Sequence, residues 1–182
     1  MMIFLLRHTE SLSNKQGIAD SGVMDTELSE RGIEEAQELV AALSENNYDL
    51  FIVSPLKRAI QTIRPFLDAL KNPRVVTEPL IIERDLGEFA GTPRGTFTRY
   101  CEENNLDKVS FRPENGESVI DVYERAKKFF NLVVEQYKEK TILICGHQIF
   151  LRCLELVLSG EPVEKYHLIK SLSNGEIREF EI

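Results

Sequence analysis

Short apolar runs recur along the chain and predict the strands of a sheet. The first occupies residues 3–6 and the second occupies residues 50–53. A third, shorter run covers residues 75–76, and a fourth covers residues 141–145. Brief, continuously apolar runs are typical of strands that are buried on both faces. Residues 176–181 instead alternate between apolar and polar side chains, which predicts an edge strand.

Between these runs, apolar positions recur with the 3.6-residue period of a helix. In residues 30–43 they fall on one face, and Ser29 is placed to cap the first turn. A second helix is predicted over residues 54–70, with Pro55 in its first turn, and we expect Pro65 to kink or interrupt it. Two further helices are predicted over residues 117–137 and 148–158.

The alternation of strands and helices predicts the class of fold. Strand–helix–strand units place their strands side by side and parallel, with helices packed on the sheet. We therefore expect an α/β protein: a three-layer α/β/α sandwich with a mostly parallel central sheet. At 182 residues the chain is expected to form a single domain, residues 1–182.

One stretch departs from this alternation. Residues 84–115 are mixed in character and rich in glycine and charge, which predicts a small cap insertion rather than another regular unit. Its aromatic residues have two interpretations: they line an apolar wall for the organic part of a ligand, or they form the core of the cap itself. They are Phe89, Phe97, Tyr100 and Phe111.

Composition narrows the classes of partner. The formal net charge of −8 disfavours nonspecific binding to nucleic acid, because such binding relies on basic patches. No stretch approaches the ~20 apolar residues that cross a bilayer, so no membrane partner is expected. No export signal is recognised, which makes the cytoplasm the expected location. Cys101, Cys145 and Cys153 match no zinc-site spacing, and the apolar surroundings of the last two indicate reduced packing residues.

Reactive residues follow three of the predicted strands. The first strand ends in Arg7-His8, the second in Ser54 with Arg58 soon after it, and another in His147. Ligands of open α/β sheets bind beyond the carboxyl ends of the strands. If these strands are parallel neighbours, the two arginines and two histidines converge on one site. We also expect the helices that follow to point free N–H groups at that site.

Two arginines and two histidines around one site favour the binding of a phosphate. Arginine donates two hydrogen bonds in a plane that matches phosphate oxygens. A neutral imidazole attacks phosphorus and forms a phosphohistidine, which splits one difficult displacement into two easier ones. Positive neighbours stabilise the charge on the equatorial oxygens. No metal and no other cofactor is expected, because the chain offers no cluster of carboxylates that would require one.

This reaction also needs a proton donor for the leaving alcohol. Glu83 is the candidate general acid, because it follows an apolar stretch that would raise its pKa, as would a nearby phosphate dianion. Glu88 and Glu117 are competing candidates.

Each of these residues also has a plainer interpretation. Arg58 is either a phosphate ligand or a solvated helix residue paired with Asp68 or Glu78. His147 after a buried strand is either a site residue or a core histidine whose ring is satisfied by hydrogen bonds. His167 has no motif around it and is interpreted as a surface residue.

Several separate motifs together resemble one family. LLRHTES, DTELSERG, SPLKRAIQT, ERDLGEFAG, GES and CGHQ occur in the order seen in the histidine phosphatase superfamily, the phosphoglycerate mutase-like fold. The resemblance implies that His8 is the nucleophile and that His147 is the second histidine of a phosphate pocket. It implies that Glu83 is the acid. The phosphate-binding residues that it implies are Arg7, Asn14 and Arg58.

The chain departs from the family pattern at one position. The family usually reads Arg-His-Gly, whereas Thr9 follows His8 here. The threonine hydroxyl offers a further donor to phosphate. Its Cβ would be strained if this position requires a positive φ.

Three functions are compatible with these residues. The leading hypothesis is a metal-independent phosphatase that hydrolyses phosphomonoesters through phospho-His8. The alternatives are a phosphoglycerate mutase-type phosphotransferase, whose members tend to be longer, and a non-catalytic module that binds a phosphorylated ligand. The expected partner is a small phosphorylated substrate, with a phosphoprotein also open. The sequence does not determine the physiological substrate or the oligomeric state.

Overall fold

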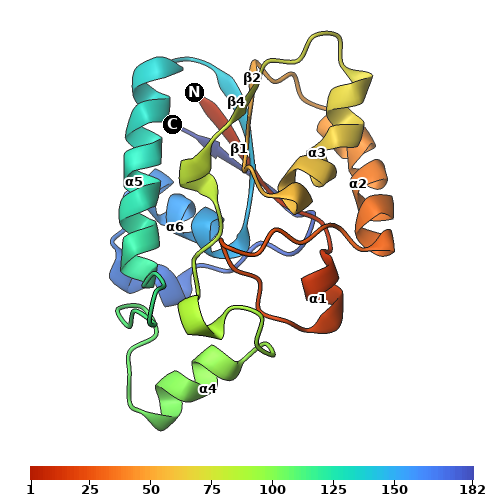
Figure 1. Ribbon diagram of the computed structural model, residues 1–182. Helices are drawn as coiled ribbons and strands as arrows, with labels where there is room; N and C mark the ends of the chain where they lie inside the picture. The colour runs from red at the N-terminus through yellow and green to blue at the C-terminus, as the bar shows by residue number, and fades with distance from the viewer.

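The computed structural model describes residues 1–182 and centres on a five-stranded sheet with the order β3-β2-β4-β1-β5 (Figure 1). Four strands are parallel: β1 (Met2–Arg7), β2 (Leu50–Val53), β3 (Val75–Thr77) and β4 (Thr141–Gly146). The fifth strand, β5 (Ile177–Glu181), pairs antiparallel with β1 at the edge of the sheet. The mostly parallel sheet and its edge strand are therefore confirmed.

Helices cover both faces of the sheet. α2 (Glu30–Leu43) and α3 (Lys57–Ala69) lie on one face, and α5 (Val119–Gln136) and α6 (Gln148–Leu158) lie on the other (Figure 1). The predicted three-layer α/β/α sandwich is confirmed. None of the helices combines the length and the apolar character needed to cross a membrane.

The central strands β1, β2 and β4 contribute side chains to two hydrophobic cores, one on each face of the sheet. Because successive side chains of a strand point to opposite faces, Ile3 and Leu5 pack with residues of α5 and α6. Phe4 and Leu6 pack with residues of α2 and α3 on the other face. β1 and β4 are buried along almost their whole length, which is why both appear as continuous apolar runs.

The helix boundaries follow the predicted ones closely, with one correction. Ser29 caps α2 by accepting a hydrogen bond from the Gly32 N–H. α3 begins only at Lys57, because Leu56 before it is extended, so Pro55 precedes the helix instead of occupying its first turn. Pro65 does not interrupt α3, which continues to Ala69.

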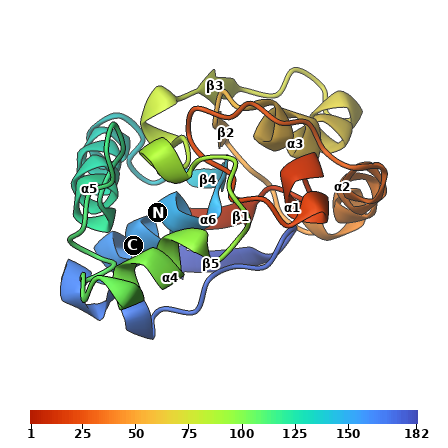
Figure 2. The ribbon, with the colours of Figure 1, turned by 60° about the horizontal axis from the view of Figure 1, so that its bottom comes forward.

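Two short helices were not anticipated. α1 (Leu12–Gln16) follows β1, and α4 (Thr96–Glu103) lies within residues 84–115. Both lie beyond the carboxyl ends of β1 and β4, at the end of the sheet that comes forward in Figure 2. Three 3₁₀ helices complete the structure: η1 (Pro79–Ile81), η2 (Gly87–Phe89) and η3 (Val163–Leu168).

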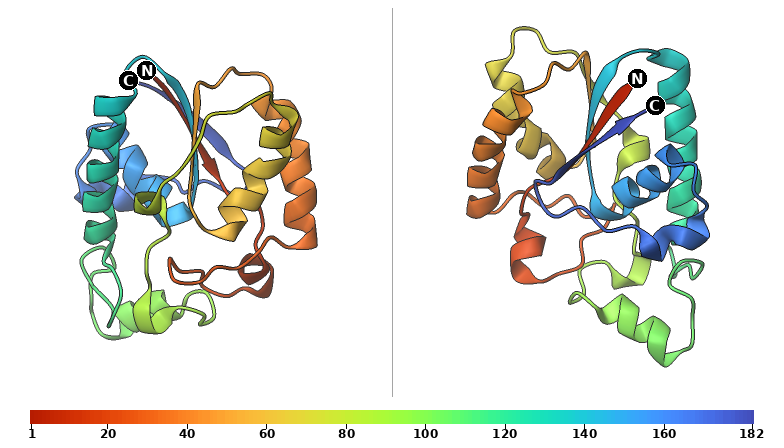
Figure 3. Two further views of the ribbon diagram at one scale, coloured as in Figure 1. Left: turned by 45° about the horizontal axis from the view of Figure 1, so that its top comes forward. Right: turned by 180° about the vertical axis from the view of Figure 1, so that it is seen from behind.

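The two chain ends meet at the opposite end of the sheet from α4 (Figure 3). The Ile182 N–H donates to the Met1 carbonyl at 2.9 Å. The end of the molecule that carries α1 and α4 is therefore built from internal segments only.

The three cysteines are buried free thiols, as predicted for Cys145 and Cys153. Burial raises the pKa of Cys153 to about 12. A thiol with so high a pKa stays protonated and unreactive at neutral pH.

Candidate active site

The carboxyl ends of β1 and β4 bring the two predicted histidines together. Arg7 pairs with Gly146 in the parallel ladder, and the His8 N–H donates to the Gly146 carbonyl at 3.0 Å. The rings of His8 and His147 lie with their centroids 5.2 Å apart. Ser54, at the end of β2, places its Oγ 2.7 Å from His147 Nε2. Three parallel strands thus deliver their last residues to one place.

A backbone contact selects the tautomer of His8. Its Nδ1 lies 2.7 Å from the Thr9 carbonyl oxygen. A carbonyl only accepts hydrogen bonds, so Nδ1 carries the proton and Nε2 keeps its lone pair. The nitrogen of His8 that keeps a free lone pair is therefore Nε2.

Both histidines are held in the neutral form. Burial lowers the pKa of His8 well below its ordinary value of 6.5, and the charges of Arg58 and Arg7 lower it further. The pKa of His147 is lowered in the same way, first by burial and then by Arg58 and His8. A neutral imidazole is the form that acts as a nucleophile.

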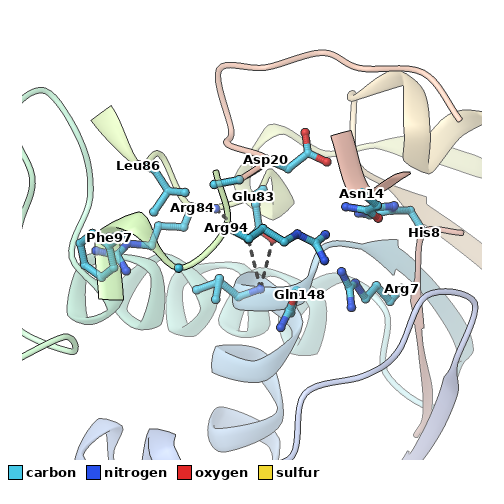
Figure 4. A pocket seen from close by; sticks show the side chains of 13 residues that line it. Arg7, His8, Asn14, Asp20, Glu83, Arg84, Leu86, Arg94, Phe97 and Gln148 are labelled. Atoms are coloured by element: carbon cyan, nitrogen blue, oxygen red, sulfur yellow. Dashed lines mark hydrogen bonds between the residues drawn. The ribbon is translucent and has the colours of Figure 1, made fainter. Parts of the chain in front are cut away.

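A pocket of about 310 Å³ opens in front of His8 (Figure 4). Four of the predicted site residues line it: Arg7, His8, Asn14 and Glu83. The other two, Arg58 and His147, do not line it, since both are completely buried behind it.

The two predicted arginines are anchored differently. Arg7 donates from Nη1 to the Leu172 carbonyl at 2.8 Å, while its buried Nε has no partner. Arg58 donates from Nη1 to the Met24 carbonyl at 2.7 Å, and its Nε lies 3.6 Å from an Asp20 carboxylate oxygen. The surface pairing of Arg58 with Asp68 or Glu78 is therefore wrong, and Arg58 is a buried cation beside the two histidines.

Asn14 is oriented by a residue that the sequence did not indicate. Its Oδ1 accepts from Asn174 Nδ2 at 2.9 Å and from the Ser11 N–H at 3.4 Å. The Asn14 amide nitrogen therefore remains available as a donor on the pocket side. Asn174 also donates to the His8 carbonyl at 2.9 Å, so it ties the end of β1 to the loop that precedes β5.

Of the three candidate acids, only Glu83 lines the pocket. Its side chain is buried, and its oxygens accept from the N–H groups of Ile149 and Phe150 at the start of α6 (dashed lines to Ile149 in Figure 4). Glu117 instead pairs with Arg125 at 2.9 Å, and Glu88 is exposed outside the pocket.

Some of the helix N–H groups that were expected to be free at the site are taken by acidic side chains. The N–H groups of Ile149 and Phe150, in the first turn of α6, donate to the side-chain oxygens of Glu83. At the start of α3, the Lys57 N–H donates to Asp25 Oδ1 at 2.6 Å. A carboxylate satisfies the exposed N–H groups of a helix start as well as a phosphate does, so in this fold acidic side chains take the positions expected for the ligand.

Thr9 fits its position without strain. It is not among the residues with positive φ. Its hydroxyl donates to the Gly32 carbonyl at 2.8 Å, and its N–H donates to Thr62 Oγ1 at 3.0 Å. The hydroxyl is therefore committed to α2 and is not a donor to a ligand in the pocket.

The pocket contains residues that sequence reasoning missed. Arg94 reaches into it from the loop before α4, and Asp20 and Gln148 also line it (Figure 4). The Arg94 N–H donates to the Gly17 carbonyl at 2.8 Å, which fixes this loop against the segment after α1. The proline and glycine that flank Arg94 indicated a loop, but only the tertiary pairing with residue 17 brings it to the pocket. No group of three or more His, Cys, Asp or Glu side chains is arranged to hold a metal ion.

The aromatic residues of segment 84–115 pack on one another. The Phe89 ring lies 5.4 Å from that of Phe97 and 5.1 Å from that of Tyr100, and Phe111 stacks on Phe97 at 6.0 Å. The interpretation as a local core is confirmed. Phe97 in addition lines the pocket.

Comparison with known proteins places the chain in a family. The model of the histidine phosphatase superfamily (branch 1) matches residues 3–182. Phosphoserine phosphatase 1 of Hydrogenobacter thermophilus is 34% identical, over 90% of this chain and 79% of its own length. A 2,3-bisphosphoglycerate-dependent phosphoglycerate mutase of Methanosarcina mazei is 30% identical, over 97% of this chain and 84% of its own. The crystal structure of the alpha-ribazole phosphatase of Shigella flexneri has a TM-score of 0.88 and 28% identity, over 100% of this chain and 91% of its own.

The chain therefore belongs to the histidine phosphatase superfamily, branch 1. The resemblance inferred from the motifs is confirmed. The apolar runs that lead into Arg7-His8 and into His147 had already located the ends of β1 and β4, where the two histidines meet.

Proposed function

We propose that the protein hydrolyses phosphomonoesters without a metal ion, through a phosphohistidine on His8. One observation carries this proposal. The ring of His8 is neutral, its Nδ1 proton is committed to the Thr9 carbonyl, and it borders a pocket that Arg7 makes cationic. A free lone pair beside an anion-binding guanidinium is the arrangement that nucleophilic attack on phosphorus requires.

In the first step, His8 Nε2 attacks the phosphorus and forms an N–P bond while the P–O bond to the alcohol breaks. The oxygen of the leaving alcohol takes both electrons of that bond and needs a proton, which Glu83 supplies. The His8 ring becomes cationic as the bond forms, and the Thr9 carbonyl that accepts from its Nδ1–H stabilises this charge.

In the second step, a water attacks the phosphorus of phospho-His8. Glu83, now a carboxylate, takes a proton from that water, and the N–P bond breaks so that its electrons return to Nε2. Inorganic phosphate leaves, and His8 and Glu83 are back in their starting forms. Glu83 thus serves as acid and then as base, as microscopic reversibility requires.

The surrounding cations stabilise the transferring group. Arg7 lines the pocket and supplies a positive charge there, Arg58 adds a second charge from its buried position near His8, and the Asn14 amide is a neutral donor. His147 is buried next to His8, with the two ring centroids 5.2 Å apart, and its Nε2 lies 2.7 Å from Ser54 Oγ. We assign it the role of a residue that positions the ring of His8.

Segment 84–115 is proposed to cap the pocket and to select the substrate. Leu86, Arg94 and Phe97 of this segment line the pocket opposite Arg7 and His8, which supports this role. Two similar proteins are a phosphoserine phosphatase and an alpha-ribazole phosphatase, which supports a small phosphorylated substrate for this protein. A phosphoserine peptide belongs in the assay panel, because a phosphoprotein would present the same phosphate group.

Turnover of p-nitrophenyl phosphate in the presence of EDTA tests the proposal. We expect hydrolysis that EDTA does not inhibit and that His8→Ala abolishes while its circular dichroism spectrum stays that of the native protein. No hydrolysis by the native protein would favour the binding module. A mutase would interconvert 2- and 3-phosphoglycerate faster than it releases phosphate, and this ratio is measured in the same preparation.

A further inference from the structure

A second pocket of about 490 Å³ lies beside the proposed active site, and no role has been assigned to it. We call it the outer pocket. Residues of α4, of the loop before α5, of α6 and of η3 line it, and these segments gather on the same side of the molecule in Figures 1 and 2. Its lining includes Arg84, Phe97, Val109, Val119, Ile149 and Arg152.

The two pockets are neighbours that share one wall. Arg84, Phe97 and Ile149 line both of them. The Arg84 guanidinium stacks on the Phe97 ring at 4.5 Å and donates from Nε to the Glu117 carbonyl at 2.7 Å, so this wall is held in place. A phosphoester held at His8 whose alcohol part extended beyond this wall would reach the outer pocket.

The outer pocket is cationic although the protein carries a net charge of −8. Arg84, Lys108 and Arg152 line it, and Asp107 is the only carboxylate in its lining. Lys108 is paired with Glu102 at 3.1 Å, so the two arginines supply the positive charge that exceeds the single negative charge of Asp107. The local field therefore favours an anion.

Arg152 is the cation best placed to hold that anion. Its guanidinium stacks on the Tyr166 ring at 4.0 Å, which fixes its plane. Its Nε is buried and has no hydrogen-bond partner in the protein. An unpaired buried donor costs free energy, and a ligand that accepts from it recovers that cost.

The rest of the lining is apolar. Val109 and Val119 form one side, and Ile149 and Phe97 form the shared wall. A fully polar ligand would leave these surfaces unsatisfied, whereas a hydrocarbon or aromatic body buries against them favourably. The pocket thus combines apolar walls with one fixed guanidinium.

We propose that the outer pocket binds the distal part of the substrate, namely an apolar body that ends in a second acidic group held by Arg152. This inference rests on the proposed phosphatase function and specifies its substrate class. The preferred substrates are extended phosphomonoesters with a carboxylate or phosphate at the far end. Short esters such as phosphoserine fill only the pocket at His8.

Esters of increasing chain length test the proposal. Each ω-phosphooxyalkanoate, which carries a carboxylate at its far end, is compared with the ω-hydroxyalkyl phosphate of equal length, whose far end is uncharged. The kcat/KM ratio of charged to uncharged ester should be near one for short chains. It should rise about tenfold or more once the carboxylate reaches the guanidinium. A ratio that does not change with length would overturn the inference.

Two variants locate the effect. Arg152→Met should return the charged-to-uncharged ratio for long chains to near one. Arg99 is exposed on the same side of the molecule but lines neither pocket, so Arg99→Met should leave the raised ratio unchanged. Val109→Trp fills the outer pocket and should lower kcat/KM for long esters of both kinds relative to short ones. If Val109→Trp leaves that comparison unchanged, long chains do not enter the outer pocket and the inference is wrong.

Failure of the outer-pocket inference can be distinguished from failure of the proposed phosphatase function. Hydrolysis of p-nitrophenyl phosphate with a flat chain-length series would refute the outer pocket alone. Absence of any hydrolysis would instead refute the phosphatase proposal and, with it, the inference that rests on it.

Discussion

At the scale of single residues, one hydrogen bond decides which nitrogen reacts. The Thr9 carbonyl fixes the proton on His8 Nδ1, so the lone pair of Nε2 is permanent and no external base has to create it. Burial beside Arg7 and Arg58 keeps the ring neutral. The proposed nucleophile is therefore prepared by its own backbone and by charge, and the proposal leaves proton transfer to another group.

Glu83 is the group that we propose for this proton transfer, and the effect of replacing it should depend on the leaving alcohol. Glu83→Gln should lower kcat about 100-fold or more for an alkyl phosphate, whose alkoxide must be protonated as it departs. The loss should be much smaller for p-nitrophenyl phosphate, because its phenolate leaves without a proton. Steady-state kinetics with both substrates measures the difference. Glu88→Gln is the matched control, since Glu88 is exposed outside the pocket, and equal losses for both substrates would remove Glu83 from the acid role.

Arg94 is expected to act on binding more than on chemistry. Arg94→Met should raise KM for phosphomonoesters roughly tenfold with a smaller effect on kcat, because an exposed guanidinium at the pocket contributes a charge-assisted contact. Arg99→Met on α4 removes the same charge outside the pocket and should leave KM unchanged. An Arg94→Met enzyme with native KM would show that this side chain does not touch the substrate.

At the scale of elements, the strands were predictable because each is a buried apolar run, and the site followed from them. Parallel neighbours carry their last residues to one edge, so Arg7, His8 and His147 were placed by topology alone. α1 escaped prediction because its five residues have no amphipathic repeat and are held by a capping box between Ser11 and Asn14.

The remaining site residues were not predictable because loops position them. The position of Arg94 depends on the β-bridge between Ile18 and Pro93. The position of Asn174 depends on the path of the loop that leads into β5. Neither contact has a local signature. The start of α6 lies at the site, as expected, but the sequence did not reveal that Glu83 would accept from two of its N–H groups.

Thr9 links the end of β1 to α2 and α3, so removing its hydroxyl should lower the free energy of unfolding. Thr9→Val keeps the shape but removes the hydroxyl that donates to the Gly32 carbonyl of α2 and contacts Thr62 Oγ1 of α3. We expect the free energy of unfolding to fall by about 1–3 kcal/mol, because buried groups lose their partner. Urea denaturation measures it, with the exposed Thr77→Val as control. A Thr9→Val protein as stable as the native one would contradict this assignment of the hydroxyl.

At the scale of the whole molecule, the buried site makes stability depend on pH. The pKa values of His8 and His147 are both lowered well below 6.5 in the folded protein. The unfolded chain therefore binds protons that the folded chain does not, and stability present above pH 6.5 is lost as the pH falls. Each histidine should contribute a loss of up to about 1.4 kcal/mol between pH 7.5 and pH 5.5.

Urea denaturation at these two pH values checks this expectation. His8→Gln and His147→Gln should each remove about half of the loss, whereas His167→Gln, at an exposed position, should not change it. Stability that is equal at both pH values would mean that the two rings are not held neutral in the folded state.

The central claim is that the phosphoryl group passes through His8, and trapping the intermediate tests it most directly. Enzyme turning over a phosphomonoester is quenched in alkaline denaturant, digested and mapped by mass spectrometry. The account predicts one phosphoryl group on the peptide that contains His8, lost on mild acid treatment and absent from His8→Ala. A phosphoryl group that survives acid, or one carried by any other residue, would contradict it.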